Sequence, residues 1–257
     1  MSTDLQRASF WKRISAWLFD SILLVSVAVL FGLLLSWALG FDGYYDRLDQ
    51  FYASYESRYE IDFELTNEAY EAMTQEEKDS YQAAYKQAYE ALIADDEAMY
   101  VYNMVINLTM LILSISILLG ILVMDFLISL WLKNGQTLGK KIFGIGVMRL
   151  DSIQLTTVQL FIRSILGKYA VETMIPVFIL IMLFLGVMDV IGLAILAGLG
   201  IGQLICLFTT RERKAIHDTF AGTVTVDIAS QRIFRSSEDL IAYTQKVHAE
   251  RAARQDY

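Results

Sequence analysis

Three long apolar runs constrain the fold of this chain more than any other feature. They cover residues 14–39, 100–132 and 173–209. Each is at least as long as the ~20 residues that a helix needs to cross the hydrocarbon core of a bilayer. Hydrophobic residues make up 55% of the chain, and soluble domains seldom carry apolar runs of this length. The sequence therefore predicts an all-α integral membrane protein that contacts the lipid bilayer.

The third run is too long for one membrane helix. A single helix over residues 173–209 would extend about 54 Å at ~1.5 Å per residue, whereas the hydrocarbon core is ~30 Å thick. Glycines flank Asp189 in the sequence GVMDVIG, so we expect a turn at residues 186–192. This gives four transmembrane helices, the last two forming a short hairpin; a re-entrant hairpin is the alternative. The expected helices cover about residues 14–38, 101–132, 173–187 and 190–209.

The formal net charge of −8 averages two regions of opposite sign. Residues 41–100 hold 16 acidic and four basic residues, whereas the rest of the chain holds 13 acidic and 17 basic residues. Lys and Arg beside membrane helices mark the cytoplasmic side. We therefore expect both termini in the cytoplasm and the acidic segment outside. The basic residues beside the apolar runs are Arg7, Lys12, Arg13, Lys133, Lys140, Lys141, Arg149, Arg211, Arg213 and Lys214.

Two local features of the apolar runs favour ordinary membrane helices. The first run follows basic residues, as in a secretory signal peptide, but it exceeds the usual 7–15 apolar residues of a cleaved signal. We therefore expect a retained first helix. Cys206 is the only cysteine and cannot form an intrachain disulfide, so we expect it to be a small apolar residue of the last helix.

The acidic segment, residues 41–100, has the composition of a helical hairpin outside the membrane. Thr66 followed by Glu68 is typical of a capped helix start. Tyr81, Tyr85 and Tyr89 recur every four residues and would form one aromatic stripe on a helix. A solvated helical insertion is one interpretation. The alternative is a vestibule that attracts cations, or a surface that docks a protein partner.

The sequence period changes on the cytoplasmic side, where β-branched and polar residues alternate. Residues 142–150, 153–158 and 222–228 each predict a short strand, and together they predict a small sheet. The chain then divides into the N-terminus and first membrane helix (1–40), the acidic extracytoplasmic insertion (41–100), the second membrane helix (101–132), a cytoplasmic loop with a strand pair and an amphipathic helix (133–172), the membrane hairpin (173–209), and a cytoplasmic His-Asp motif, strand and polar tail (210–257).

Charged residues within or beside the apolar runs are candidates for a functional site. An ionised side chain deep in a bilayer costs at least ~2.5–3.5 kcal/mol on insertion scales, so such groups need partners or water. Asp20 follows Arg13 by seven positions, so the two share a helix face about 10.5 Å apart along the axis. Asp125 has a similar expected depth and would share a proton or hold a cation with Asp20. Alternatively, Asp125 pairs with a base or bonds to backbone.

Several other classes of site are excluded by spacing or composition. His217 and His248 are the only histidines, so the chain offers no histidine-rich metal site, and we expect no metal. Only three residues separate Gly135 from Gly139 in NGQTLGKK, which does not fit a phosphate-binding Walker loop. No serine triad or intramembrane aspartyl motif is present either. We expect neither an enzyme nor a bound cofactor, and no nucleic acid partner.

Three segments in order resemble the RDD family of bacterial integral membrane proteins. FWKRISAWLFD resembles the opening of its first helix, NGQTLGKKIFGIGVMRLDS with LFIRSILGK resembles its glycine-lysine loop and the following arginine, and RKAIHDTFAGTVTVD resembles its closing motif. Asp125 is not part of these motifs. The residues that the resemblance identifies are Arg13, Asp20, Gly135, Thr137, Gly139, Lys140, Arg163, His217 and Asp218.

The resemblance implies a location in the bacterial cytoplasmic membrane and favours transport, since some members of the family are linked to sodium/proton exchange. We therefore expect a small transporter for cation/proton exchange or proton-coupled solute movement, with Arg13, Asp20 and Asp218 at its site. Four short helices are few for a solute pathway, so we expect a homo-oligomer. The alternative is a scaffold or accessory protein, in which the charges lock the helices and the acidic segment docks a partner.

Overall fold

The computed structural model describes residues 7–209 and 214–255. The predicted basic residues Arg211 and Arg213 lie outside the described residues. The chain forms two compact units, which are described separately: Met1–Val29 with Ile117–Tyr257, and Leu30–Ser116.

Three helical stretches are long and apolar enough to cross a membrane, by length and composition, among the residues described. The predicted first two helices are confirmed as helices, and a further apolar helix, α10, follows the third stretch. The three stretches are α1 (Phe10–Leu39), α5 (Asp96–Ile121) with η1 (Leu122–Leu127) and α6 (Ile128–Leu132), and α8 (Thr157–Phe161) with η2 (Ile162–Met174) and α9 (Ile175–Phe184).

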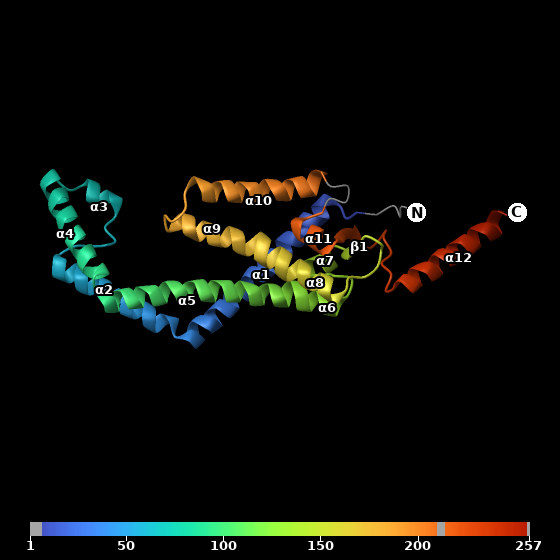
Figure 1. Ribbon diagram of the computed structural model, residues 1–257, viewed down its shortest axis with the longest axis horizontal. Helices are drawn as coiled ribbons and strands as arrows, with labels where there is room; N and C mark the ends of the chain where they lie inside the picture. The colour runs from blue at the N-terminus through green and yellow to red at the C-terminus, as the bar shows by residue number, and fades with distance from the viewer. Residues whose placement is uncertain (1–6, 210–213, 256–257) are drawn as a thin grey trace. The chain divides into compact units, whose positions relative to one another are not determined.

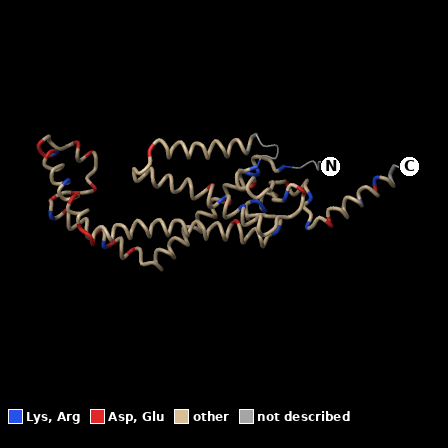
Figure 2. Tube along the Cα trace, viewed as in Figure 1, with Lys and Arg blue, Asp and Glu red and all other residues tan. Residues whose placement is uncertain are grey.

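The predicted turn in the third apolar run is present. Helix α9 ends at Phe184, Gly186 has a φ of 69°, and α10 (Val190–Thr209) begins at Val190. A positive φ is easy for glycine and lets the chain reverse direction here. In Figure 1 the two helices run antiparallel, and Figure 2 shows that neither carries a charged residue along its length. Both helices of the hairpin are therefore free of charged residues, and Asp189 lies in the turn between them.

The predicted strand at residues 153–158 is wrong, because a helix begins in its place. Thr156 caps this helix: its hydroxyl accepts from the Gln159 amide at 3.2 Å, while the Gln159 side chain accepts from the Thr156 amide at 3.2 Å. This capping box satisfies amides that a strand would have used in a ladder. Only Ile153 makes a bridge, to Phe234. The third long helix therefore starts at Thr157 instead of residue 173.

The sheet of the first unit has two antiparallel strands, β1 (Ile145–Arg149) and β2 (Thr223–Asp227). Their inner face buries Met148, Val224 and Val226. Lys12 near the start of α1 forms an ion pair with Asp227 at 2.7 Å. The sheet thus joins the start of α1 to chain segments on both sides of the hairpin. Two short helices, α7 (Leu138–Ile142) and α11 (Ile216–Ala221), flank the strands in sequence, and the polar helix α12 (Ser237–Gln255) follows them.

The second unit is the acidic helical segment with its adjoining helix ends. It contains α2 (Phe41–Tyr59), α3 (Asn67–Glu71) and α4 (Gln75–Ile93), and Figure 2 shows acidic residues over all of them. Thr66 caps α3 as predicted, and Thr74 forms a capping box with Glu77 at the start of α4. The tyrosine stripe is present, with Tyr85 and Tyr89 stacked at a centroid distance of 6.4 Å.

Candidate functional site

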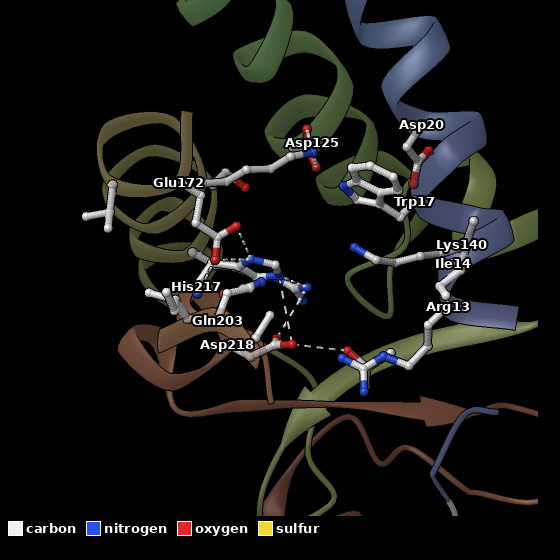
Figure 3. Close-up of a pocket in the computed structure, with 18 of the residues that line it drawn as sticks. Arg13, Ile14, Trp17, Asp20, Asp125, Lys140, Glu172, Gln203, His217 and Asp218 are labelled. Atoms are coloured by element: carbon white, nitrogen blue, oxygen red, sulfur yellow. Dashed lines mark hydrogen bonds and ion pairs between the residues drawn. The ribbon is translucent and has the colours of Figure 1, made fainter. Parts of the chain in front are cut away.

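A cavity of about 730 Å³ lies in the first unit, and Figure 3 shows its charged lining. Side chains from α1, η1, α7, η2, α10 and α11 contribute to it, so distant parts of the sequence meet there. Apolar residues of α1 and α10 form much of the remaining wall. The charged or titratable residues that line the cavity are Arg13, Asp20, Asp125, Lys140, Arg163, Lys168, Glu172, His217 and Asp218.

Asp20 is buried and holds α7 against α1. Its carboxylate accepts from the Gly139 backbone amide at 2.8 Å and from the Thr137 hydroxyl. Thr137 is also the N-cap of α7, because its hydroxyl accepts from the Lys140 amide at 3.4 Å. A Cβ on Gly139 would lie 2.5 Å from the Ala16 carbonyl oxygen, so only glycine permits this approach. Both oxygens of Asp20 therefore bond to neutral donors of the loop that the resemblance identified.

Asp125 pairs with a base, which was the alternative to a shared carboxylate site. The Lys168 amine donates to its two carboxylate oxygens at 2.7 and 2.6 Å. Asp125 is 7% exposed, so its charge needs this compensation. Asp20 and Asp125 line the same cavity, but each already has its own donors.

Asp218 is the most deeply buried carboxylate of the site, at 1% exposed. Arg163 approaches one oxygen to 3.3 Å, and the hydroxyls of Thr223 and Thr225 donate at 2.6 and 3.3 Å. Burial alone would raise the pKa of the Asp218 carboxyl. The neighbouring Arg163 and His217 and the hydrogen bond from Thr223 outweigh burial, so the pKa lies well below its usual range. Asp218 therefore remains ionised.

His217 connects Glu172 to Arg163, as Figure 3 shows for its contact with Glu172. Its Nδ1 lies 2.8 Å from one Glu172 oxygen, and its backbone amide donates to the other at 2.9 Å. Its Nε2 lies 3.0 Å from Arg163 Nη2, which is always a donor. His217 therefore bridges the carboxylate of Glu172 and the guanidinium of Arg163.

Lys140 differs from the other cations of the site. Its half-buried side chain extends between Trp17 and Arg13 in the view of Figure 3. Within the described ranges, its amine makes no ion pair within 4.0 Å and no hydrogen bond. Burial, together with the positive charge of Arg163, lowers the pKa of Lys140 to about 7, although Asp125 partly opposes this. Lys140 can therefore exchange a proton near neutral pH.

Sequence reasoning missed Lys168 and Glu172, because it assumed α-helical geometry. In an α-helix, at about 100° per residue, Arg163 and Glu172 would point in roughly opposite directions. Residues 162–174 instead form a π-helix, in which hydrogen bonds span five residues. The wider turn aligns Arg163, Lys168 and Glu172, at spacings of five and four, along one side facing the cavity.

Of the remaining predicted site residues, one lines the cavity and the others shape the backbone around it. Arg13 lines the cavity. Thr137 and Gly139 act through Asp20. Gly135 is not among the lining residues; it has a φ of 58°, and a Cβ there would lie 3.0 Å from Val147. Gly135 therefore serves the tight turn that leads from α6 to α7.

A second cavity, of about 600 Å³, lies within the second unit. Aromatic and acidic side chains line it, and no Lys or Arg is among its lining residues. Phe63 and Tyr85 meet edge to face at a centroid distance of 5.5 Å. The aromatic and acidic lining residues are Asp49, Tyr52, Glu56, Asp62, Phe63, Glu64, Tyr85, Tyr89 and Tyr102.

Comparisons with known proteins agree with the three motifs. No curated protein and no solved structure gives a match to this chain. The model of the RDD family matches residues 7–222, which include α1, the glycine-lysine loop, η2 and α11. The match covers most of the chain and every charged residue of the first cavity, and on this ground the chain is a member of the RDD family.

Proposed function

We propose that this protein is a small, non-enzymatic membrane transporter that couples proton movement to the movement of a cation or solute through the first cavity. The Lys140 amine carries the proposal. It lines the cavity, has no ion-pair partner among the described residues, and has a pKa of about 7. Titratable groups between membrane helices are characteristic of proton relays in pumps and transporters.

The proposed roles differ from those expected from the sequence. Lys140 gains and loses the proton, while the Arg163–Asp218 pair fixes the charge beside it. Asp20 positions α7, and therefore Lys140, through Thr137 and Gly139. Asp20 thus has a structural role in this proposal, in place of the ion-binding role first expected.

We propose that the chain crosses the bacterial cytoplasmic membrane four times with both termini in the cytoplasm. Support comes from the sheet, in which β1 before the hairpin pairs with β2 after it, and from the Lys12–Asp227 ion pair beside α1. These contacts gather three chain segments at one place, so the hairpin must leave and return to the same side. Labelling of single cysteines at Thr3 and Arg251 from each side of intact cells tests this placement.

We also propose that the transporter is a homo-oligomer, which would supply more helices around the pathway. A Cβ on Gly198 or Gly202 of α10 would meet nothing within 4 Å among the described residues. Small residues at this spacing let helices of separate chains approach closely. Cross-linking of the protein in membranes tests this, and loss of the cross-link in Gly198→Leu would place α10 at the interface.

A flux assay tests the transport proposal. The full chain is reconstituted into liposomes that contain a pH-sensitive dye, and a sodium gradient is imposed. Wild-type protein should change the internal pH, Lys140→Gln should reduce the rate to that of protein-free liposomes, and the exposed neighbour Lys141→Gln should retain the wild-type rate. Wild-type flux equal to that of empty liposomes, for sodium and for other gradients, would overturn the proposal.

The scaffold alternative retains support from one observation. Asp20 bonds only to neutral groups that fix α7, as a structural lock requires. In this alternative the acidic second unit docks a basic or cationic partner at its aromatic cavity. Binding of a basic partner that survives Lys140→Gln but is lost in Tyr85→Ala would favour the scaffold.

A further inference from the structure

The hydrogen-bond donors and acceptors that line the first cavity are not equally satisfied. Each of its four carboxylates already accepts at both oxygens: Asp20 from α7 and its cap, Asp125 from Lys168, Glu172 from His217, and Asp218 from Thr223 and Thr225. Each acidic oxygen of the lining therefore has a donor among the described residues. The unmet capacity therefore lies with the donors.

Two cationic groups supply these unused donors. Arg163 is 5% exposed, and its buried Nη1 has no hydrogen-bond partner in the part of the chain that the structure describes. A buried donor left unsatisfied costs about 1–3 kcal/mol, and more when it is charged. The Lys140 amine is the second, with no partner among the same residues. The two groups are close enough for the charge of Arg163 to lower the pKa of Lys140. An oxyanion in the cavity would pair with the Lys140 amine and be attracted by the charge of Arg163.

Most of the remaining lining is apolar, and much of it comes from the apolar helices α1 and α10. Ile14 and Trp17 of α1 face the cavity together with Leu196, Leu199 and Leu204 of α10. A small hydrated anion would leave these side chains without apolar contact. A ligand with an anionic head and a hydrocarbon chain matches both parts of the lining, and basic pockets between membrane helices are known to bind lipid head groups.

We propose that the cavity binds an anionic phospholipid, whose phosphate accepts from the Lys140 amine beside the Arg163 guanidinium and whose acyl chain packs between α1 and α10. This goes beyond the proposed function, because a bound lipid does not require that the protein transports anything. Free phosphate and the lipid head group present the same oxyanion to the cavity. Only the lipid also has a hydrocarbon chain that can pack against the apolar wall.

The test measures equilibrium binding of a short-chain phosphatidylglycerol to the full chain in detergent, one pH unit below the Lys140 pKa of about 7. Lys140→Gln removes a charge-assisted hydrogen bond and should weaken binding by about tenfold or more. Lys141→Gln is the matched control, because Lys141 is exposed and does not line the cavity. It should bind as wild type does.

A second variant tests the chain-binding part without touching a charge. Gly200 lines the cavity, and a Cβ there meets nothing within 4 Å, so Gly200→Leu fills space without a clash. It should weaken lipid binding, whereas Ala197→Leu, at an exposed position of α10 outside the lining, should not. Thermal stability of each variant confirms folding.

Binding measurements with two other ligands distinguish an anionic lipid from free phosphate. Inorganic phosphate alone should bind much more weakly than the lipid, and a zwitterionic lipid of the same chain length should bind less tightly than the anionic one. Equal binding of inorganic phosphate, or lipid binding unchanged in both Lys140→Gln and Gly200→Leu, would overturn the proposal. Because binding is measured without flux, a failure of transport leaves this result intact, and the reverse also holds.

Discussion

Asp20 is a charged residue whose position is explained by packing. In wild type, the Thr137 hydroxyl and the Gly139 amide both donate to the Asp20 carboxylate. Asp20→Asn replaces one of the two acceptor oxygens with an NH₂ group, which then faces one of these donors. A buried donor without an acceptor costs about 1–3 kcal/mol, so the variant should melt at a lower temperature in detergent. Asp189→Asn, in the exposed turn of the hairpin, is the control and should melt as wild type does. Equal melting of the two variants would contradict this role of Asp20.

Lys140 gives a pH dependence whose sign is fixed by its lowered pKa. The pKa is about 7 in the folded protein, against 10.5 for a solvent-exposed lysine. Between these values the unfolded chain binds the proton and the folded chain does not, so the contribution of Lys140 to stability increases as pH rises. Wild type should therefore gain stability relative to Lys140→Gln between pH ~7 and ~10. Melting temperatures of wild type and Lys140→Gln as a function of pH measure this difference in stability. Lys141→Gln is the control and should follow wild type. The same pH dependence in wild type and Lys140→Gln would contradict the lowered pKa of Lys140.

At the scale of elements, the contact between η2 and α11 sets the geometry of the site. A Cβ on Gly167 would lie 2.7 Å from the Cα of His217, so Gly167→Ala must separate the two helices. Overpacking of this kind costs about 1–3 kcal/mol. Gly43→Ala in α2 adds the same methyl group where a Cβ meets nothing within 4 Å, and controls for the difference in helix propensity. Thermal melting should therefore be lowered only in Gly167→Ala, and a normal melt would mean that α11 can shift at no cost.

The sequence predicted elements whose cause is local and missed those whose cause is tertiary. The long helices follow from apolar length, and the turn near Gly186 follows from local glycines. The strand at residues 153–158 was predicted because its alternation resembled that of β1, although the Thr156–Gln159 capping box was already present in the sequence. The π-helix that aligns Lys168 and Glu172 has no comparable local signal, and the partners of these two residues, Asp125 and His217, lie 43 and 45 residues away in the sequence.

The partners of the buried charges are a further case in which sequence spacing was insufficient. A spacing of seven correctly put Arg13 and Asp20 on one side of α1, and both line the cavity. The donors to Asp20 lie more than 100 residues away, at Thr137 and Gly139. The resemblance had selected the right segments, but only the folded chain assigns their contacts.

At the scale of the whole molecule, the two units separate the two cavities. Every residue lining the first cavity belongs to Met1–Val29 or Ile117–Tyr257, and every residue lining the second belongs to Leu30–Ser116. Replacing residues 41–95 with a flexible Gly/Ser linker of about ten residues should therefore leave the first cavity intact. The shortened protein should bind phosphatidylglycerol with the affinity of the full chain and should respond equally to Lys140→Gln.

The same shortened protein also discriminates the two functional hypotheses. If the acidic unit only concentrates cations near the membrane, its removal should lower sodium-driven flux at low salt and have little effect at high salt, because screening removes long-range attraction. If the unit is the docking surface of a scaffold, its removal should abolish partner binding at every salt concentration, while lipid binding at the first cavity persists. Loss of lipid binding on removal of residues 41–95 would show instead that the two units are coupled, and would contradict their independence.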